Sequence, residues 1–220
     1  TPLVHDDIAR LLNGLGQGKR CTSIPKLNLQ SMDVLKLYDV VFLTCAELYQ
    51  QDFQATAYLR KYVELGGTLY ASDLQYERIA RAFPEYQAKQ IALPGIQQNI
   101  EAVVTDPGLE AYLGHKMIPL AFDAPDWRAA SFDPAKVTVC LKGLYRNKLG
   151  KASVAPLLVK FRHGQGTVIF TSFHHSRNET PTVRKMLEYL AIAPLNARSE
   201  ARLHALMKQS EFRAEDVRPI

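Results

Sequence analysis

Two pairs of adjacent residues carry the side chains best suited to chemistry. Ser72-Asp73 and His174-His175 each follow a short, apolar, β-prone run. A serine hydroxyl becomes a nucleophile when a histidine accepts its proton and a carboxylate orients that histidine. Asp73 or Glu179 would supply the carboxylate. Ser72, Asp73, His174, His175 and Glu179 are therefore our candidate catalytic residues.

A second group of residues could bind a ligand. Cys45 and Glu47 follow another apolar run, and Arg177 comes soon after the two histidines. Arg177 could hold an anionic group, and Cys45 is a second candidate nucleophile. Simpler interpretations stand beside these. Ser72 and Asp73 also suit the first turn of a helix, and Cys45 also suits a small buried position.

The histidine pair raises the question of a metal site. Such a site would need a third ligand, for which Asp73 and Glu179 are the nearby candidates. The three cysteines, Cys21, Cys45 and Cys140, are scattered and form no CxxC pair. We therefore expect reduced thiols, no metal site and no cofactor.

The elements before these residues should bring them together. Residues 39–44 and 68–71 read as buried strands, and the apolar stripe over residues 52–64 predicts a helix that ends at Gly66-Gly67. A strand, a helix and a second strand in succession favour a parallel sheet. Because ligands bind beyond the carboxyl ends of such strands, we expect the candidates to converge at one edge of the sheet.

The rest of the chain predicts further strands and four more helices. Three β-prone runs between residues 98 and 150 suggest an inserted or edge β-layer, and residues 157–161 and 167–171 predict a hairpin. Helices are expected near the N-terminus, from residue 74 to 82 and from 182 to 191. We divide the chain into an α/β domain over residues 1–195, with its β-rich region at about 98–150, and a C-terminal helix and tail over residues 196–220.

Three segments carry a resemblance to a known family. They read YDVVFLT at residues 38–44, LRKYVELGGTLYASD at 59–73 and GQGTVIFTSFHH at 164–175. In this order the chain resembles the class I glutamine amidotransferase-like superfamily, particularly its trehalose-utilisation (ThuA-like) branch. The resemblance implies a three-layer, flavodoxin-like α/β fold with a mostly parallel sheet and an antiparallel extension.

The resemblance also shows where this sequence departs from active amidotransferases. Those enzymes carry a cysteine at the turn, or elbow, after the central strand, and a histidine followed two residues later by glutamate after the last strand. Here the elbow reads Ala71-Ser72-Asp73, and neither histidine has that glutamate. The family pattern therefore implies the fold without cysteine-dependent glutamine hydrolysis.

Composition narrows the classes of partner. The 220 residues are 47% hydrophobic and 22% charged, and the net charge of +5 is spread without a block of Lys and Arg. This distribution argues against nucleic-acid binding, and the sequence shows neither a membrane span nor a signal peptide, so we expect a cytoplasmic location.

The resulting functional hypothesis is a non-classical amidotransferase-like domain without cysteine catalysis, which acts as a ligand-binding or assembly module with a small molecule or a protein as its partner. The alternative is a hydrolase that uses Ser72 or Cys45 as nucleophile and His174 or His175 as base. The sequence predicts no oligomeric state.

Overall fold

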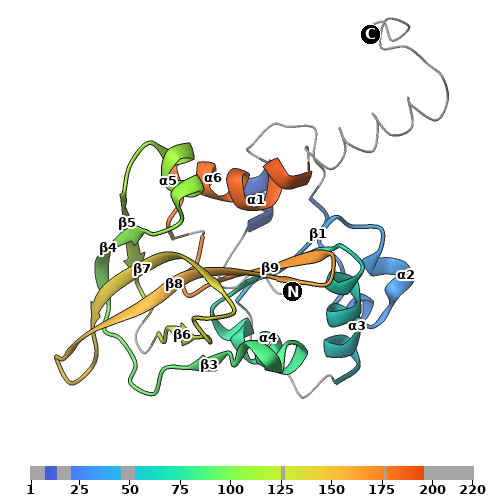
Figure 1. Cartoon of the computed structure of the whole chain (residues 1–220), viewed down its shortest axis with the longest axis horizontal. Coiled ribbons are helices and arrows are strands. Elements are labelled where there is room, and N and C mark those ends of the chain that lie inside the picture. The colour runs from blue at the N-terminus through green and yellow to red at the C-terminus, as the bar shows by residue number, and fades with distance from the viewer. Residues whose placement is uncertain (1–7, 14–20, 46–52, 125–126, 176, 196–220) are drawn as a thin grey trace, which may run out of the picture.

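A seven-stranded sheet forms the centre of the protein (Figure 1). In this computed structural model, the described residues are 8–13, 21–45, 53–124, 127–175 and 177–195. The strands follow the spatial order β1-β2-β9-β8-β7-β4-β5. In that order their bounds are Val40–Leu43, Thr68–Ser72, Gly166–Thr171, Ala152–His163, Thr138–Arg146, Gln98–Val104 and Met117–Phe122. A separate two-stranded sheet pairs β3, Lys89–Gln90, with β6, Ala130–Ser131.

The first three strands in this order are parallel. β1 pairs with β2, and β2 pairs with β9. Helix α3, Phe53–Glu64, connects β1 to β2, and the chain leaves it through Gly66, whose φ of 111° is in the region that favours glycine. All five residues of β2 are buried, as expected for a strand with neighbours on both sides and helices on both faces.

The prediction of a mostly parallel sheet is wrong in its proportions. Two of the six strand pairs are parallel, and the four pairs that involve β8, β7, β4 and β5 are antiparallel. Two of the antiparallel pairs follow from short connections, because the loops over residues 147–151 (β7 to β8) and 164–165 (β8 to β9) reverse the chain, whereas a parallel crossover needs a dozen or more residues. The predicted antiparallel extension is present, and it belongs to the same sheet.

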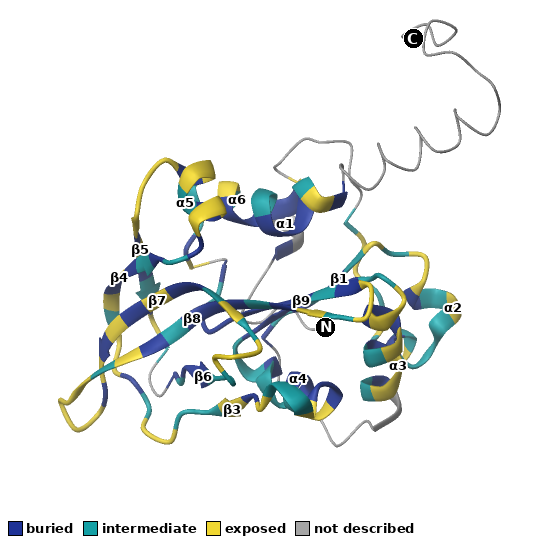
Figure 2. Ribbon diagram, in the orientation of Figure 1, coloured by how far each residue is buried: buried dark blue, intermediate teal, exposed yellow. Residues whose placement is uncertain are grey.

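Helices pack on both faces of the sheet (Figures 1 and 2). On one face, α1, α5 and α6 contribute to a hydrophobic cluster with β4, β5 and β7. On the other face, α2, α3 and α4 contribute to a second cluster with β1, β2 and β9. The bounds of the other five α-helices are Ile8–Asn13 (α1), Met32–Leu35 (α2), Tyr76–Ala82 (α4), Pro107–Leu113 (α5) and Pro181–Leu187 (α6).

Shorter helical turns complete the described chain. Three 3-10 turns span Lys26–Gln30, Asp73–Gln75 and Pro84–Tyr86, and a π-helical turn over Glu188–Ile192 extends α6. The expected C-terminal helix, together with the rest of residues 196–220, lies outside the described residues, and the domain division stays a prediction. Among the described helices, none is long and apolar enough to cross a membrane.

Helix α5 was not predicted. The residues Asp106-Pro107-Gly108 are also typical of a turn, but here the Asp106 carboxylate caps a helix by accepting a hydrogen bond of 2.8 Å from the backbone N–H of Leu109. Pro107 occupies the first turn, where its missing N–H costs nothing, and Gly114 ends the helix at a φ of 78°. The same three residue types suit a turn and a helix start, so local pattern alone did not separate them.

Candidate functional site

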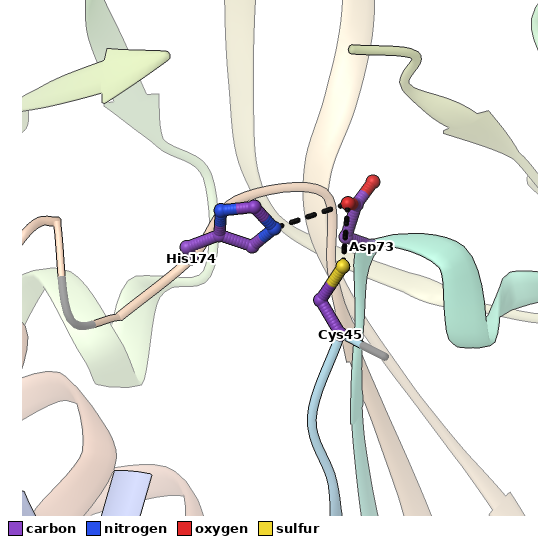
Figure 3. Close-up of side chains that lie close together, drawn as sticks. All are labelled: Cys45, Asp73 and His174. Carbon is purple, nitrogen blue, oxygen red and sulfur yellow. Dashed lines mark hydrogen bonds and ion pairs between the residues drawn. The ribbon is translucent and has the colours of Figure 1, made fainter. Parts of the chain in front are cut away.

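The carboxyl ends of the three parallel strands bring three reactive side chains together. Cys45 follows β1, Asp73 follows β2 and His174 follows β9 (Figure 3). The strand register explains the meeting, because Leu43 pairs with Ala71 and Ser72 pairs with Thr171. The predicted convergence is therefore confirmed for these three side chains.

One carboxylate oxygen is the centre of this Cys45-Asp73-His174 cluster. Oδ2 of Asp73 accepts a hydrogen bond from the Cys45 thiol, with Sγ at 3.0 Å, and one from Nε2 of His174, also at 3.0 Å. Sγ, the Asp73 carboxylate oxygen and the His174 ring nitrogen all lie within 4.8 Å of one another. Asp73 thus stands between the thiol and the imidazole.

The cluster lies at the boundary between core and solvent. The side chains of Asp73 and His174 are 16% and 14% exposed, whereas Cys45 is buried. The thiol is therefore enclosed while the other two groups remain accessible. A ligand would approach from the side of Asp73 and His174.

The backbone of Asp73 has an unusual conformation. Its φ is 47°, in the left-handed region that few residues other than glycine adopt, and it begins the Asp73–Gln75 turn. Aspartate tolerates this region better than most side chains. The sharp turn directs the carboxylate toward Cys45 and His174, and strained residues of this kind are common where a site must hold one geometry.

The Ser72 side chain holds the backbone of Cys45 and does not, as we had considered, cap the turn that follows it. Its hydroxyl oxygen accepts a hydrogen bond of 3.1 Å from the backbone N–H of Cys45, and the residue is 2% exposed. It makes no side-chain capping bond to the turn that follows. Ser72 instead fixes the position of the Cys45 backbone beside Asp73.

The two neighbouring histidines have different environments. His174 faces the cluster, whereas His175 is fully buried. Nε2 of His175 is hydrogen-bonded to the Tyr70 hydroxyl at 2.8 Å, and its ring contacts the rings of Tyr70 and Phe173. Only His174 is therefore placed to act at the surface.

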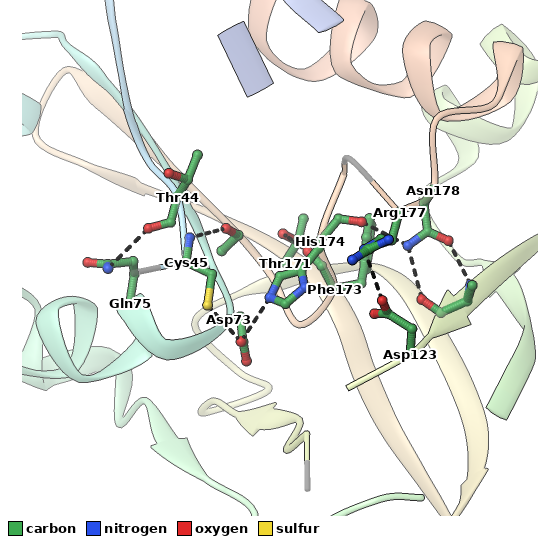
Figure 4. A network of polar contacts seen from close by, with 12 residues as sticks. Thr44, Cys45, Asp73, Gln75, Asp123, Thr171, Phe173, His174, Arg177 and Asn178 are labelled. Atoms are coloured by element: carbon green, nitrogen blue, oxygen red, sulfur yellow. Dashed lines mark hydrogen bonds and ion pairs between the residues drawn. The ribbon is translucent and has the colours of Figure 1, made fainter. Parts of the chain in front are cut away.

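Arg177 and Glu179, two of the remaining predicted residues, form ion pairs outside the cluster. Arg177 forms an ion pair with Asp123, with 3.0 Å between Nε and Oδ2 (Figure 4). Glu179 forms an ion pair with Arg184 of α6. Glu47 lies outside the described residues, so its expected role in ligand binding stays a prediction.

Asn178 was missed by the sequence analysis and holds the histidine loop in place. It is buried, and its side-chain oxygen accepts a hydrogen bond of 2.6 Å from the backbone N–H of Ala121. Its side-chain nitrogen donates to the carbonyls of Ala121 and His174, at 3.1 and 2.8 Å (Figure 4). These bonds join the loop after β9 to strand β5. Because 57 residues separate Asn178 from Ala121, no local pattern could have indicated the role.

A second missed residue, Gln75, holds the end of β1. Its side-chain nitrogen donates a hydrogen bond of 3.2 Å to the carbonyl of Thr44, the residue before Cys45 (Figure 4). Gln75 is 3% exposed, so this bond is shielded from water. Together with Ser72, it ties the backbone that carries Cys45 to the elbow.

A small pocket adjoins the cluster. The residues that line it include Asp73, His174, Phe122, Trp127 and Phe173. Its volume of about 10 Å³ is enough to hold about one water molecule. The pocket therefore suits a water molecule or a small ion better than an amino acid side chain.

Comparison with known proteins places the fold but not the function. No protein-family model and no curated protein match the sequence. Three solved structures with 12–16% sequence identity share the fold. A putative ThuA-like protein from Bacteroides uniformis has a TM-score of 0.57 at 14% identity, over 82% of this chain and 79% of its own.

The other two similar structures cover comparable shares of the chain. The cytoplasmic protein STM1381 from Salmonella typhimurium LT2 has a TM-score of 0.55 at 16% identity, over 81% of each chain. The mmIFT52 N-terminal domain has a TM-score of 0.62 at 12% identity, over 84% of this chain and 90% of its own. The similarity to a ThuA-like protein agrees with the resemblance seen in the sequence and concerns the fold alone.

Proposed function

We propose that the protein is a three-layer, amidotransferase-like domain of the ThuA-like kind that binds a ligand at the Cys45-Asp73-His174 cluster and does not hydrolyse glutamine. The observation that carries this proposal is the meeting of a thiol and an imidazole on one carboxylate oxygen, beside a pocket. Ligands of open α/β sheets bind beyond the carboxyl ends of the strands, which is where these three side chains meet. A cytoplasmic location and the choice between a small molecule and a protein partner stay predictions.

The position of Asp73 argues against a cysteine nucleophile. A nucleophilic cysteine reacts as a thiolate and is stabilised by a nearby positive charge. Here Sγ donates a hydrogen bond of 3.0 Å to the Asp73 carboxylate, which disfavours a second negative charge next to it. The elbow position that carries the nucleophile in amidotransferases holds Ser72 and Asp73.

The alternative is a hydrolase in which Cys45 attacks and His174 is the base. It is favoured by the single observation that the thiol sulfur and the imidazole nitrogen lie within 4.8 Å of each other. A rotation of Asp73 would let them meet. The version of this mechanism with Ser72 and His175 has no such support, because each of these two side chains is hydrogen-bonded elsewhere.

Hydrolysis assays on metal-free protein separate the two functions. We expect release of ammonia from glutamine, and of nitrophenol from p-nitrophenyl acetate, to equal the background rate in the wild type, Cys45→Ser and His174→Ala. Cys21→Ser is the matched control, because Cys21 lies outside the cluster. Turnover that disappears in Cys45→Ser and persists in Cys21→Ser would establish the hydrolase and refute the proposed binding function.

Labelling with iodoacetamide tests the state of the thiol directly. We expect Cys45 to be alkylated no faster than an ordinary cysteine at pH 7, because the enclosed thiol shares its proton with Asp73. Peptide mapping by mass spectrometry gives the rate at each cysteine. A Cys45 rate far above that of Cys21 would indicate a reactive thiolate.

A further inference from the structure

We propose that the Cys45-Asp73-His174 cluster is a binding site for a divalent transition metal ion of the zinc class. The inference rests on the proposed function and names the ligand of that site. Sγ of Cys45, Oδ2 of Asp73 and Nε2 of His174 are the three ligand atoms. From the sequence we expected no metal site, because only Asp73 and Glu179 were considered as a third ligand beside the two histidines.

The donor set selects the class of ion. Thiolate and imidazole are preferred by zinc and by similar ions such as cobalt, whereas magnesium and calcium prefer oxygen ligands alone. A thiolate and a carboxylate also carry two negative charges, which balance the charge of a divalent ion. The proton that Cys45 now donates to Asp73 would be released when the ion binds.

The distances fit a tetrahedral ion with little movement. Bonds of about 2.0 Å to nitrogen and oxygen and about 2.3 Å to sulfur place tetrahedral ligand atoms about 3.3–3.5 Å apart. The sulfur–oxygen and nitrogen–oxygen distances are both 3.0 Å. The sulfur–oxygen and nitrogen–oxygen distances would each lengthen by about 0.5 Å or less, and the sulfur and nitrogen atoms, which lie within 4.8 Å of each other, would come to lie about 3.5 Å apart.

The surroundings hold the ligands as a metal site requires. Ser72 fixes the backbone of Cys45, and Asn178 donates a hydrogen bond of 2.8 Å to the carbonyl of His174. The left-handed backbone of Asp73 sets the direction of its carboxylate. Metal sites depend on supporting contacts of this type, because they hold the ligands in place before the ion arrives.

The site also has room for a fourth ligand. The pocket beside Asp73 and His174 has a volume of about 10 Å³, enough for about one water molecule. A zinc site with three protein ligands and one open position is typical of an exchangeable or reactive centre rather than of a purely structural one. The geometry points to an ion that small molecules can reach.

Cobalt titration tests the proposal, because Co²⁺ reports its ligands in its absorption spectrum. Addition of Co²⁺ to protein treated with chelator should give a thiolate-to-cobalt charge-transfer band and the intense visible bands of a tetrahedral ion, saturating at one ion per chain. Zn²⁺ should then remove these bands by displacing the cobalt. Affinity for Zn²⁺ is measured by competition with a chromophoric chelator.

Variants assign the ligands. Cys45→Ser should abolish the charge-transfer band, and Asp73→Asn and His174→Ala should each weaken Zn²⁺ binding by at least about 100-fold, the upper limit for loss of a supporting contact alone. Cys21→Ser and Glu179→Gln should bind like the wild type. Glu179 is a stringent control because it is the other carboxylate considered as a ligand, and it pairs with Arg184 outside the cluster.

The outcomes separate the metal proposal from the proposed function. A charge-transfer band that persists in Cys45→Ser, or no band at all in the wild type, overturns the metal site. If metal-free protein in that case also fails to hydrolyse the two substrates, the non-catalytic binding function survives without a metal. If metal-free protein shows turnover that depends on Cys45, the binding function itself fails.

Discussion

The ring of His174 donates to the carboxylate of Asp73 across a distance of 3.0 Å, although 101 residues separate them in the sequence. The contact exists because β2 and β9 are adjacent and parallel, with Ser72 opposite Thr171. Asp73 comes directly after Ser72, the last paired residue of β2, and His174 comes soon after Thr171, the last paired residue of β9. The sheet therefore creates the pair, and the loops only adjust it.

The two adjacent histidines should respond differently to substitution. In metal-free protein, His175→Ala should lower the free energy of unfolding by about 3 kcal/mol, because it empties a fully buried position and leaves the Tyr70 hydroxyl without its 2.8 Å partner. His174→Ala should cost about 1 kcal/mol or less, because its side chain is partly exposed. Urea denaturation followed by circular dichroism measures both values, and equal losses would contradict the assigned roles.

The left-handed backbone of Asp73 predicts an inversion of the usual order of alanine and glycine. Both Asp73→Gly and Asp73→Ala remove the carboxylate, so their difference reports the backbone. At a φ of 47° glycine should be more stable than alanine by about 1 kcal/mol. At Glu188, whose φ of −58° is helical, the Glu188→Ala variant should be more stable than Glu188→Gly. Thermal or urea unfolding of the four variants checks the sign, and the same order at both positions would be evidence against the strained elbow.

The ion pair between Asp106 and Lys160 should stabilise the fold against acid. Burial on its own would raise the pKa of Asp106, but the hydrogen bond from Lys160, at 2.5 Å, and the backbone N–H of Leu109 outweigh it and hold the pKa below its ordinary value of 3.8. Because the pKa of Asp106 is lower in the folded state, its ionised carboxylate contributes fully to folding stability above the unfolded-state pKa. This contribution is lost as pH falls through the folded-state pKa. Wild-type stability should therefore decrease steeply below about pH 4.

Asp106→Asn tests this assignment. It should lower the free energy of unfolding at pH 7 by about 2 kcal/mol, less than for a fully buried pair because Lys160 is partly exposed, and flatten the loss of stability in acid. The matched control is Asp33→Asn, which breaks the exposed pair with Lys36 and should change little. Urea midpoints between pH 2 and 7 distinguish the two, and an unchanged acid profile in Asp106→Asn would assign the sensitivity to another group.

Gly166 should be intolerant of a side chain for lack of space. A Cβ at this position would lie 2.1 Å from the carbonyl oxygen of Val63 and 2.3 Å from that of Gly67, so the start of β9 would have to move away from the end of α3. Gly166→Ala should cost about 3 kcal/mol. Gly150→Ala, in open space at a φ of 75°, should cost about 1 kcal/mol through backbone conformation alone. Similar losses measured by urea denaturation would show that crowding is not the cause.

The sequence by itself determined the local elements and the places where chemistry could occur. The apolar runs at residues 39–44 and 68–71 predicted β1 and β2. These features follow from the pattern of apolar side chains along a few neighbouring residues, which fixes the local structure. The strand–helix–strand order also predicted that the cluster would lie at the edge of the sheet.

Only the tertiary structure decided which side chains meet. It paired Asp73 with Cys45 and His174, turned Ser72 into a backbone anchor and buried His175 against Tyr70. Strand order and register set these distances, and neither is encoded in the spacing of residues along one strand. A shift of one residue in register would move every side chain to the opposite face, so the identity of the site depends on the packing of the whole sheet.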